Sequence, residues 1–72
     1  MHQDDHESRQ EKQAKLDSLR EEHRALDLQI ADLTARPYIS PEDQVEINRL
    51  KKLKLRKKDE IFLMATQIGA EI

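Results

Sequence analysis

Both prolines of the chain lie in one short stretch, RPYISPED at residues 36 to 43, and this break limits the fold more than any other feature. Pro37 disfavours helical geometry at the residue before it, so a helix should end near residue 35. Ser40 and Pro41 form a helix start, because a serine hydroxyl accepts an unpaired amide hydrogen and proline fits the first helical position. We therefore expect helices over 8–35 and 41–68 around a loop at 36–40, with Gly69 in a left-handed turn that ends the second helix.

Seam residues recur at alternating spacings of three and four in both segments, which is the pattern of a heptad seam. The predicted hairpin seam consists of Leu16, Leu19, His23, Leu26, Ile30, Leu33, Ile47, Leu50, Lys54, Lys57, Ile61, Met64 and Ile68. Folding the chain back at the loop brings the two halves into register, with His23 facing Lys54 and Leu19 facing Lys57. The sequence predicts an all-α fold, an antiparallel two-helix hairpin with coiled-coil character over residues 8–72, preceded by a frayed tail at 1–7.

The hairpin should be weakly stable by itself. Its 72 residues are 39% charged and include one Phe, one Tyr and no Trp, so the core must be small. A second set of apolar residues lies off the seam: Leu28, Leu53, Leu55, Phe62 and Leu63. These are either scattered exposed hydrophobes or a second face that is buried by self-association. We expect the latter, in a homo-oligomer such as a four-helix dimer or a larger helical bundle.

The second segment contains a basic stretch, and its cations are Lys51, Lys52, Lys54, Arg56, Lys57 and Lys58. Three interpretations stay open: solvated helix faces, a surface for phosphate or nucleic acid, or a surface for an acidic protein or a membrane. On a helix these cations spread around the axis, and no aromatic residue lies among them to stack on bases, which favours the first interpretation. Seam lysines usually send their ammonium groups outward, where carboxylates of the same hairpin or of a second copy can pair with them. We also expect Asp27 near Lys51 and Lys15 near Glu60.

No pattern in the sequence indicates catalysis. Cysteine is absent, the hydroxyl side chains are dispersed, and a single glycine excludes a glycine-rich phosphate loop. We predict no catalytic residue, no cofactor, no metal site and no enzyme activity. No apolar run approaches the ~20 residues that span a bilayer, and no signal-peptide pattern opens the chain. A cytoplasmic location is the simplest expectation.

Two segments carry a family resemblance, EHRALDLQIADL at 22–33 and EINRLKKLKLRKKDEI at 46–61. Over residues 16 to 64 the chain resembles the YdcH-like family of small bacterial proteins. The match rests on His23 with the Leu-Asp and Ile that follow it, and on the run from Leu50 through Ile61. The chain is less similar to SlyX-like coiled coils. The resemblance implies a bacterial origin and a short helical hairpin, and it implies no activity.

These observations predict a small self-associating interaction or scaffold protein. It should bind through its coiled-coil seam and the apolar residues beside the seam, and its partners could include other proteins. The alternative is a nucleic-acid-associated protein that uses residues 51–58.

Overall fold

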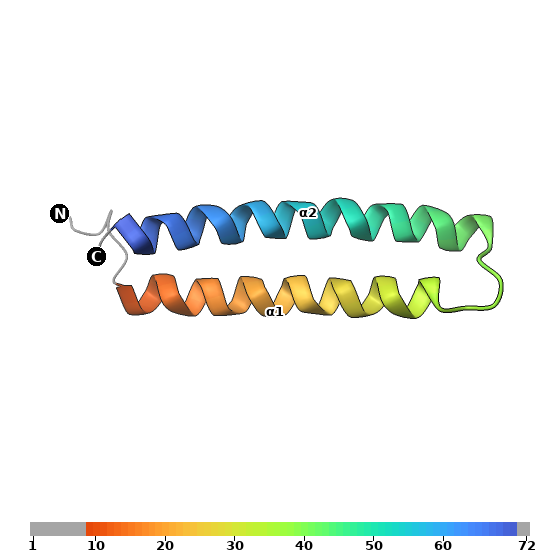
Figure 1. The fold of residues 1–72 in the computed structure, drawn as a ribbon, viewed down its shortest axis with the longest axis horizontal. Helices are drawn as coiled ribbons and strands as arrows, with labels where there is room; N and C mark the ends of the chain where they lie inside the picture. The colour runs from red at the N-terminus through yellow and green to blue at the C-terminus, as the bar shows by residue number, and fades with distance from the viewer. Residues whose placement is uncertain (1–8, 71–72) are drawn as a thin grey trace.

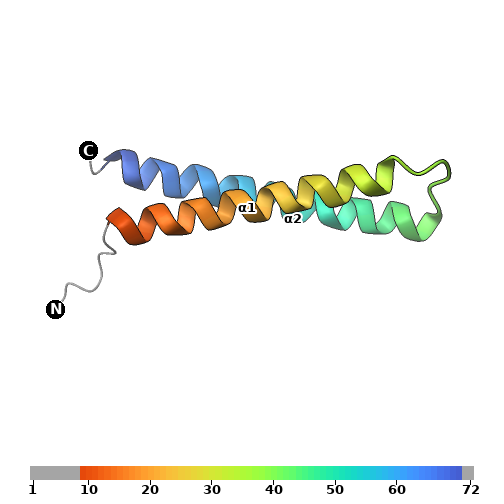
Figure 2. The ribbon, with the colours of Figure 1, turned by 90° about the horizontal axis from the view of Figure 1, so that it is seen from below.

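Two helices joined by one loop make up residues 9–70, the part of the chain that the computed structural model describes. Helix α1 spans Arg9–Thr34 and helix α2 spans Pro41–Ala70. They run antiparallel and side by side, crossing at a shallow angle (Figures 1 and 2), and form a rod of 55 × 17 × 15 Å. The prediction of an all-α helical hairpin is confirmed. The tail expected at residues 1–7 lies outside the described residues.

The start of α2 is fixed by a reciprocal cap. The Asp43 N–H donates to Ser40 Oγ at 3.0 Å, and the Ser40 N–H donates to Asp43 Oδ2 at 3.2 Å. The Ser40 carbonyl accepts the Gln44 N–H at 2.9 Å, which closes the first helical turn. Two of the amide hydrogens near the helix start are therefore satisfied by side chains, with an aspartate in the place that glutamate usually takes in this motif.

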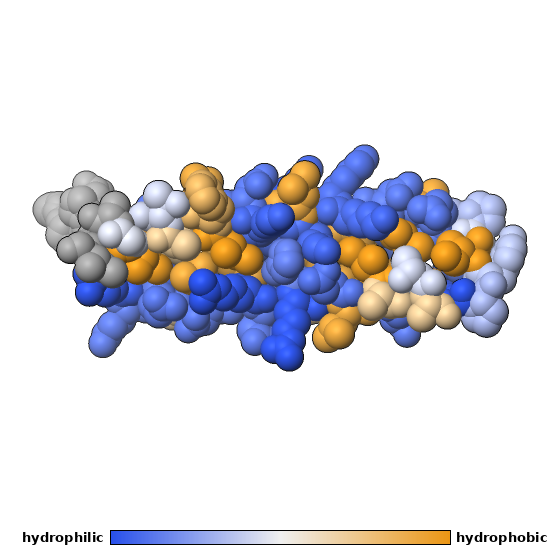
Figure 3. All heavy atoms as spheres, viewed as in Figure 1, coloured by the Kyte–Doolittle hydropathy of each residue, from blue (hydrophilic) through white to orange (hydrophobic). Residues whose placement is uncertain are grey.

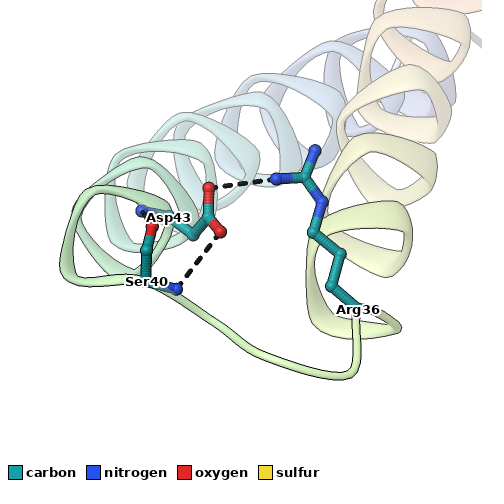
Figure 4. A network of polar contacts seen from close by, with 3 residues as sticks. All are labelled: Arg36, Ser40 and Asp43. Carbon is teal, nitrogen blue, oxygen red and sulfur yellow. Dashed lines mark hydrogen bonds and ion pairs between the residues drawn. The ribbon is translucent and has the colours of Figure 1, made fainter.

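A contact between the start of the loop and the first turn of α2 closes the loop (Figure 4). The guanidinium of Arg36, just after α1, donates from Nη1 to Asp43 Oδ1 at 3.1 Å. Asp43 therefore caps α2 with one carboxylate oxygen and binds the other side of the loop with the second. We call Arg36, Ser40 and Asp43 the loop clamp.

The C-terminal end of α2 differs from the expectation. Helix α2 continues past Ile68 to Ala70, and Gly69 does not adopt a positive φ. Glycine permits a left-handed turn without requiring one, and the space where a Cβ of residue 69 would stand is open. No neighbouring element therefore forces the chain to turn at this point.

The core is a single thin stripe between the helices. Only Leu16, Ile47 and Leu50 are buried apolar residues within the described part of the chain, with 4%, 2% and 2% of their surface exposed. The other predicted seam residues are half-buried. Figure 3 shows apolar side chains along the line between the helices and more of them at both outer edges, separated by hydrophilic ones. A two-helix hairpin can cover only one stripe of each helix, and much apolar surface stays outside.

Candidate functional site

Two ion pairs replace apolar packing in the middle of the seam. Lys54 Nζ lies 2.5 Å from Asp27 Oδ1, and Lys57 Nζ lies 2.7 Å from Glu22 Oε1. Both lysine side chains are half-buried. The carboxylates belong to α1 of the same hairpin, so each lysine buries its methylenes between the helices and pairs its ammonium locally.

The two ion pairs lie on opposite flanks of the seam. Glu22 and Asp27 are five residues apart, which places them about 140° apart around α1, on either side of His23. Lys54 therefore leaves the seam toward one flank, and Lys57 leaves it toward the other. A slip of α2 along α1 by one turn would break both pairs, so together they favour the observed register.

His23 lies between these pairs and is incompletely satisfied. Its Nδ1 is 3.8 Å from Asp27 Oδ2, while its Nε2 is buried and has no hydrogen-bond partner among the described residues. A hydrogen bond from Lys54, and the positive charges of Lys54 and His23, hold the pKa of Asp27 below its ordinary value. A hydrogen bond to Glu22 raises the pKa of Lys57 above its ordinary value.

The predicted pair between Asp27 and Lys51 is corrected by the structure. Asp27 pairs with Lys54, and Lys51 is exposed. The reason is the reach of the lysine, since Lys54 starts on the seam beside α1 and its flexible chain extends sideways to the nearest flank carboxylate.

Lys15 and Glu60, which we expected near one another, line one shallow groove between the helices. This groove has a volume of about 440 Å³ and is floored by Leu19 and Met64.

Acid should destabilise the hairpin through Asp27 and Asp43. The pKa of Asp43 is lowered by the backbone hydrogen bond from Ser40, with help from Arg36. For a carboxyl group whose pKa is lowered by folding, the stability it contributes is complete above the ordinary pKa of 3.8 and is lost as the pH falls through the folded value. We expect the midpoint of thermal unfolding to stay level from pH 7 to about pH 5 and to fall below about pH 4. Circular dichroism at each pH measures this, and a midpoint that rises on acidification would contradict it.

Large apolar side chains stand exposed outside the seam. Leu28, Leu55, Phe62 and Leu63, all predicted as interface residues, have between 59% and 69% of their surface exposed. Leu53, the fifth predicted residue, is half-buried. Val45 is also 69% exposed and was not among the predicted residues. It lies ten residues before Leu55, and the helical steps between them hold the polar residues Asn48 and Lys52, so the spacing of apolar residues alone did not single it out.

The basic stretch is divided by the fold. Lys51, Lys54 and Lys58 line one hollow of about 280 Å³ on α2, together with Leu55. Lys57 turns to the opposite flank, toward Glu22, while Lys52 and Arg56 are exposed elsewhere on the helix. The structure therefore brings three of the six predicted cations together, and Lys54, one of these three, is paired with Asp27.

A comparison with known protein families identifies the family of this chain. The family model described as a protein of unknown function, DUF465, matches residues 16–65, most of the chain. The chain belongs to the DUF465 family. YdcH-like proteins belong to this family, so the resemblance predicted from the sequence is confirmed. The span matched to DUF465 contains both ion pairs, His23, the loop clamp and the exposed residues of α2. No curated protein and no solved structure gave a match.

Two features of this DUF465 chain escaped the sequence reasoning. Lys12 is buried, with 9% of its surface exposed, and it lies four residues before Leu16, where one more step of the heptad would have reached it. The contact of Arg36 with Asp43 had no periodic signal, because it depends on how the loop folds.

In the described part of the DUF465 chain, no three His, Cys, Asp or Glu residues are grouped so that they could hold a metal ion. Between residues 9 and 70, neither helix is long and apolar enough to cross a membrane.

Proposed function

We propose that this DUF465 hairpin is a self-associating interaction module, which assembles with copies of itself and offers helix faces to protein partners. The observation that carries the proposal is the balance between buried and exposed apolar residues. Among the described residues three apolar side chains are buried, whereas Leu28, Val45, Leu55, Phe62 and Leu63 are each at least 59% exposed. A chain with so small a core gains from covering the rest of its apolar surface.

The expected gain is large compared with the stability of a small domain. Burying an exposed Leu or Phe side chain contributes about 1.5–3 kcal/mol, and a single core in a domain of this size rarely supplies more than about 3–5 kcal/mol. The rod also offers enough area. One long side measures 55 by 17 Å, which is of the order of the ~800 Å² that each partner contributes to a standard interface.

A nucleic-acid-associated role is the second candidate. It is favoured by the hollow in which Lys51, Lys54 and Lys58 lie together. The ion pairs of Lys54 with Asp27 and of Lys57 with Glu22 weigh against it, because paired lysines contribute less to phosphate binding. We therefore rank self-association first. The cytoplasmic location and the absence of enzyme activity stay predictions.

Sedimentation equilibrium separates the two candidates. We expect the full chain to form an oligomer whose stability changes little between 50 and about 500 mM salt and does not depend on a mixed pool of RNA and duplex DNA. Binding to nucleic acid that weakens steeply with salt would favour the second candidate, because phosphate contacts release condensed counterions. A monomer at every concentration would contradict self-association.

A matched pair of variants tests whether the outer apolar residues carry the assembly. Phe62→Ser should shift the oligomer toward monomer while the helical signal of the monomer is kept. Tyr38→Ser removes an aromatic ring of similar exposure from the loop, 73% against 69%, and should leave the assembly unchanged. An equal effect of both variants would contradict a helix-face interface.

A further inference from the structure

We infer that the partner surface is the outer face of α2, and that a second copy packs on it with its own α2 antiparallel, about a two-fold axis between residues 58 and 59. This inference rests on the proposed self-association and adds the face, the orientation and the contacts. The occupant is a second copy of this chain.

Helix α2 carries a second heptad pattern on its outside. Its residues are Asn48, Lys52, Leu55, Asp59, Phe62 and Thr66, at alternating spacings of four and three, and every one of them is exposed. Leu55 and Phe62 lie one heptad apart on one line of the helix, with 59% and 69% of their surface exposed. A stripe with this repeat is suited to a second helix that packs along α2.

The distribution of charge selects the antiparallel orientation. Residues 51–58 hold six cations, Asp59 and Glu60 follow, and residues 61–70 carry no charged side chain. Four of these cations are exposed, namely Lys51, Lys52, Arg56 and Lys58, whereas the other two are paired with carboxylates of α1. In a parallel pair each exposed cation would lie beside the same residue of the second copy, and such like-charge contacts are destabilising. In the antiparallel pair the cationic segment lies beside the acidic and uncharged segment of the second copy. Lys58 of each chain then lies beside Asp59 of the other, and these two pairs offset the approach of the two Asp59 carboxylates at the axis.

The same alignment places apolar groups opposite one another. Leu55 lies across from Phe62 of the second copy, and the reverse contact occurs on the other side of the axis. Leu55 is part of the hollow that is also lined by Lys51, Lys54 and Lys58. A Phe62 ring from the second copy would cover Leu55 there, against the methylenes of the lysines, with an ammonium group near the ring face. Two such Leu–Phe contacts bracket the Lys58–Asp59 pairs and form a dimer core.

Disulfide trapping tests this geometry in the full chain. The sequence contains no cysteine, so one substitution gives one thiol. Lys52 and Thr66 are both exposed and lie within one residue of the same height in the proposed dimer, because an axis between residues 58 and 59 places Lys52 level with residue 65 of the second copy. An equimolar mixture of Lys52→Cys and Thr66→Cys chains should form the mixed disulfide under mild oxidation, several-fold in excess of either homodimer by mass spectrometry. Gln29→Cys, at an exposed position of α1, is the control and should stay uncrosslinked.

The outcomes distinguish this inference from the proposed function. Homodimers of the Lys52→Cys chain in excess would indicate a parallel pair and overturn the inference. An oligomer in sedimentation that traps neither combination would place the interface elsewhere; it would overturn the inference and leave self-association standing. A monomer in sedimentation with no trapped species would overturn both.

Discussion

Replacing Leu50 with alanine should remove most of the helical signal of the hairpin at 25 °C. Leu50 is 2% exposed and is one of three buried apolar residues in the described part of the chain, so a truncated side chain leaves a cavity that the two helices cannot fill. Such core truncations cost about 2–5 kcal/mol, which is comparable to the whole stability of a domain with so small a core. Circular dichroism at 222 nm and urea unfolding measure the loss.

The matched control for Leu50→Ala is Leu28→Ala. Leu28 is 64% exposed and lies on the side of α1 away from the seam, so at chain concentrations below assembly its truncation should change the free energy of unfolding by less than about 0.5 kcal/mol. Both substitutions remove the same atoms from a helical leucine, and the comparison therefore isolates the effect of burial. Similar urea midpoints for the two variants would contradict the assignment of the core.

Replacing His23 with leucine should stabilise the hairpin. The buried Nε2 of His23 has no hydrogen-bond partner among residues 9–70, and an unsatisfied buried polar atom costs about 1–3 kcal/mol. Leucine continues the apolar seam at this position and removes that cost. The loss of the 3.8 Å contact with Asp27 offsets little, because half of the Asp27 side chain is exposed and solvent screens the pair. We expect a gain of about 1–2 kcal/mol in the free energy of unfolding, measured by urea denaturation.

Arg24→Leu is the control for His23→Leu. Residue 24 is next in the chain but exposed, so the same new side chain there should leave the urea midpoint nearly unchanged. A His23→Leu chain with an equal or lower urea midpoint than the natural sequence would indicate that the imidazole contributes to stability and would contradict a cost from its buried Nε2.

Local and periodic features of the hairpin were readable from the sequence. Ser40 and Pro41 act within one helical turn, so the start of α2 depends on few neighbours. The seam from Leu16 to Ile68 follows from spacing, and each of its residues is buried or half-buried in the structure. The pattern recurs over several heptads, and that repetition makes the signal robust to a single polar residue such as Lys54.

Long flexible side chains limited the prediction of the site. A lysine has four rotatable bonds between its backbone and its ammonium, so spacing alone does not decide which carboxylate it reaches. For this reason the sequence predicted Lys51 as the lysine near Asp27, whereas the structure pairs Asp27 with Lys54. The sequence placed His23 opposite Lys54, and in the structure the two flanking ion pairs lie on either side of His23.

The loop clamp also bears on the order in which the hairpin folds. Arg36 and Asp43 are seven positions apart, and a loop of this size closes in roughly 10–100 ns at a small cost in chain entropy. Each later layer of the predicted register joins residues further apart in the chain, as His23 with Lys54 and then Leu19 with Lys57. Contacts nested in this way can form one after another, each shortening the search for the next. This nesting predicts that the hairpin closes from its loop outward, so that the end that carries the 440 Å³ groove is the last to form and the first to open.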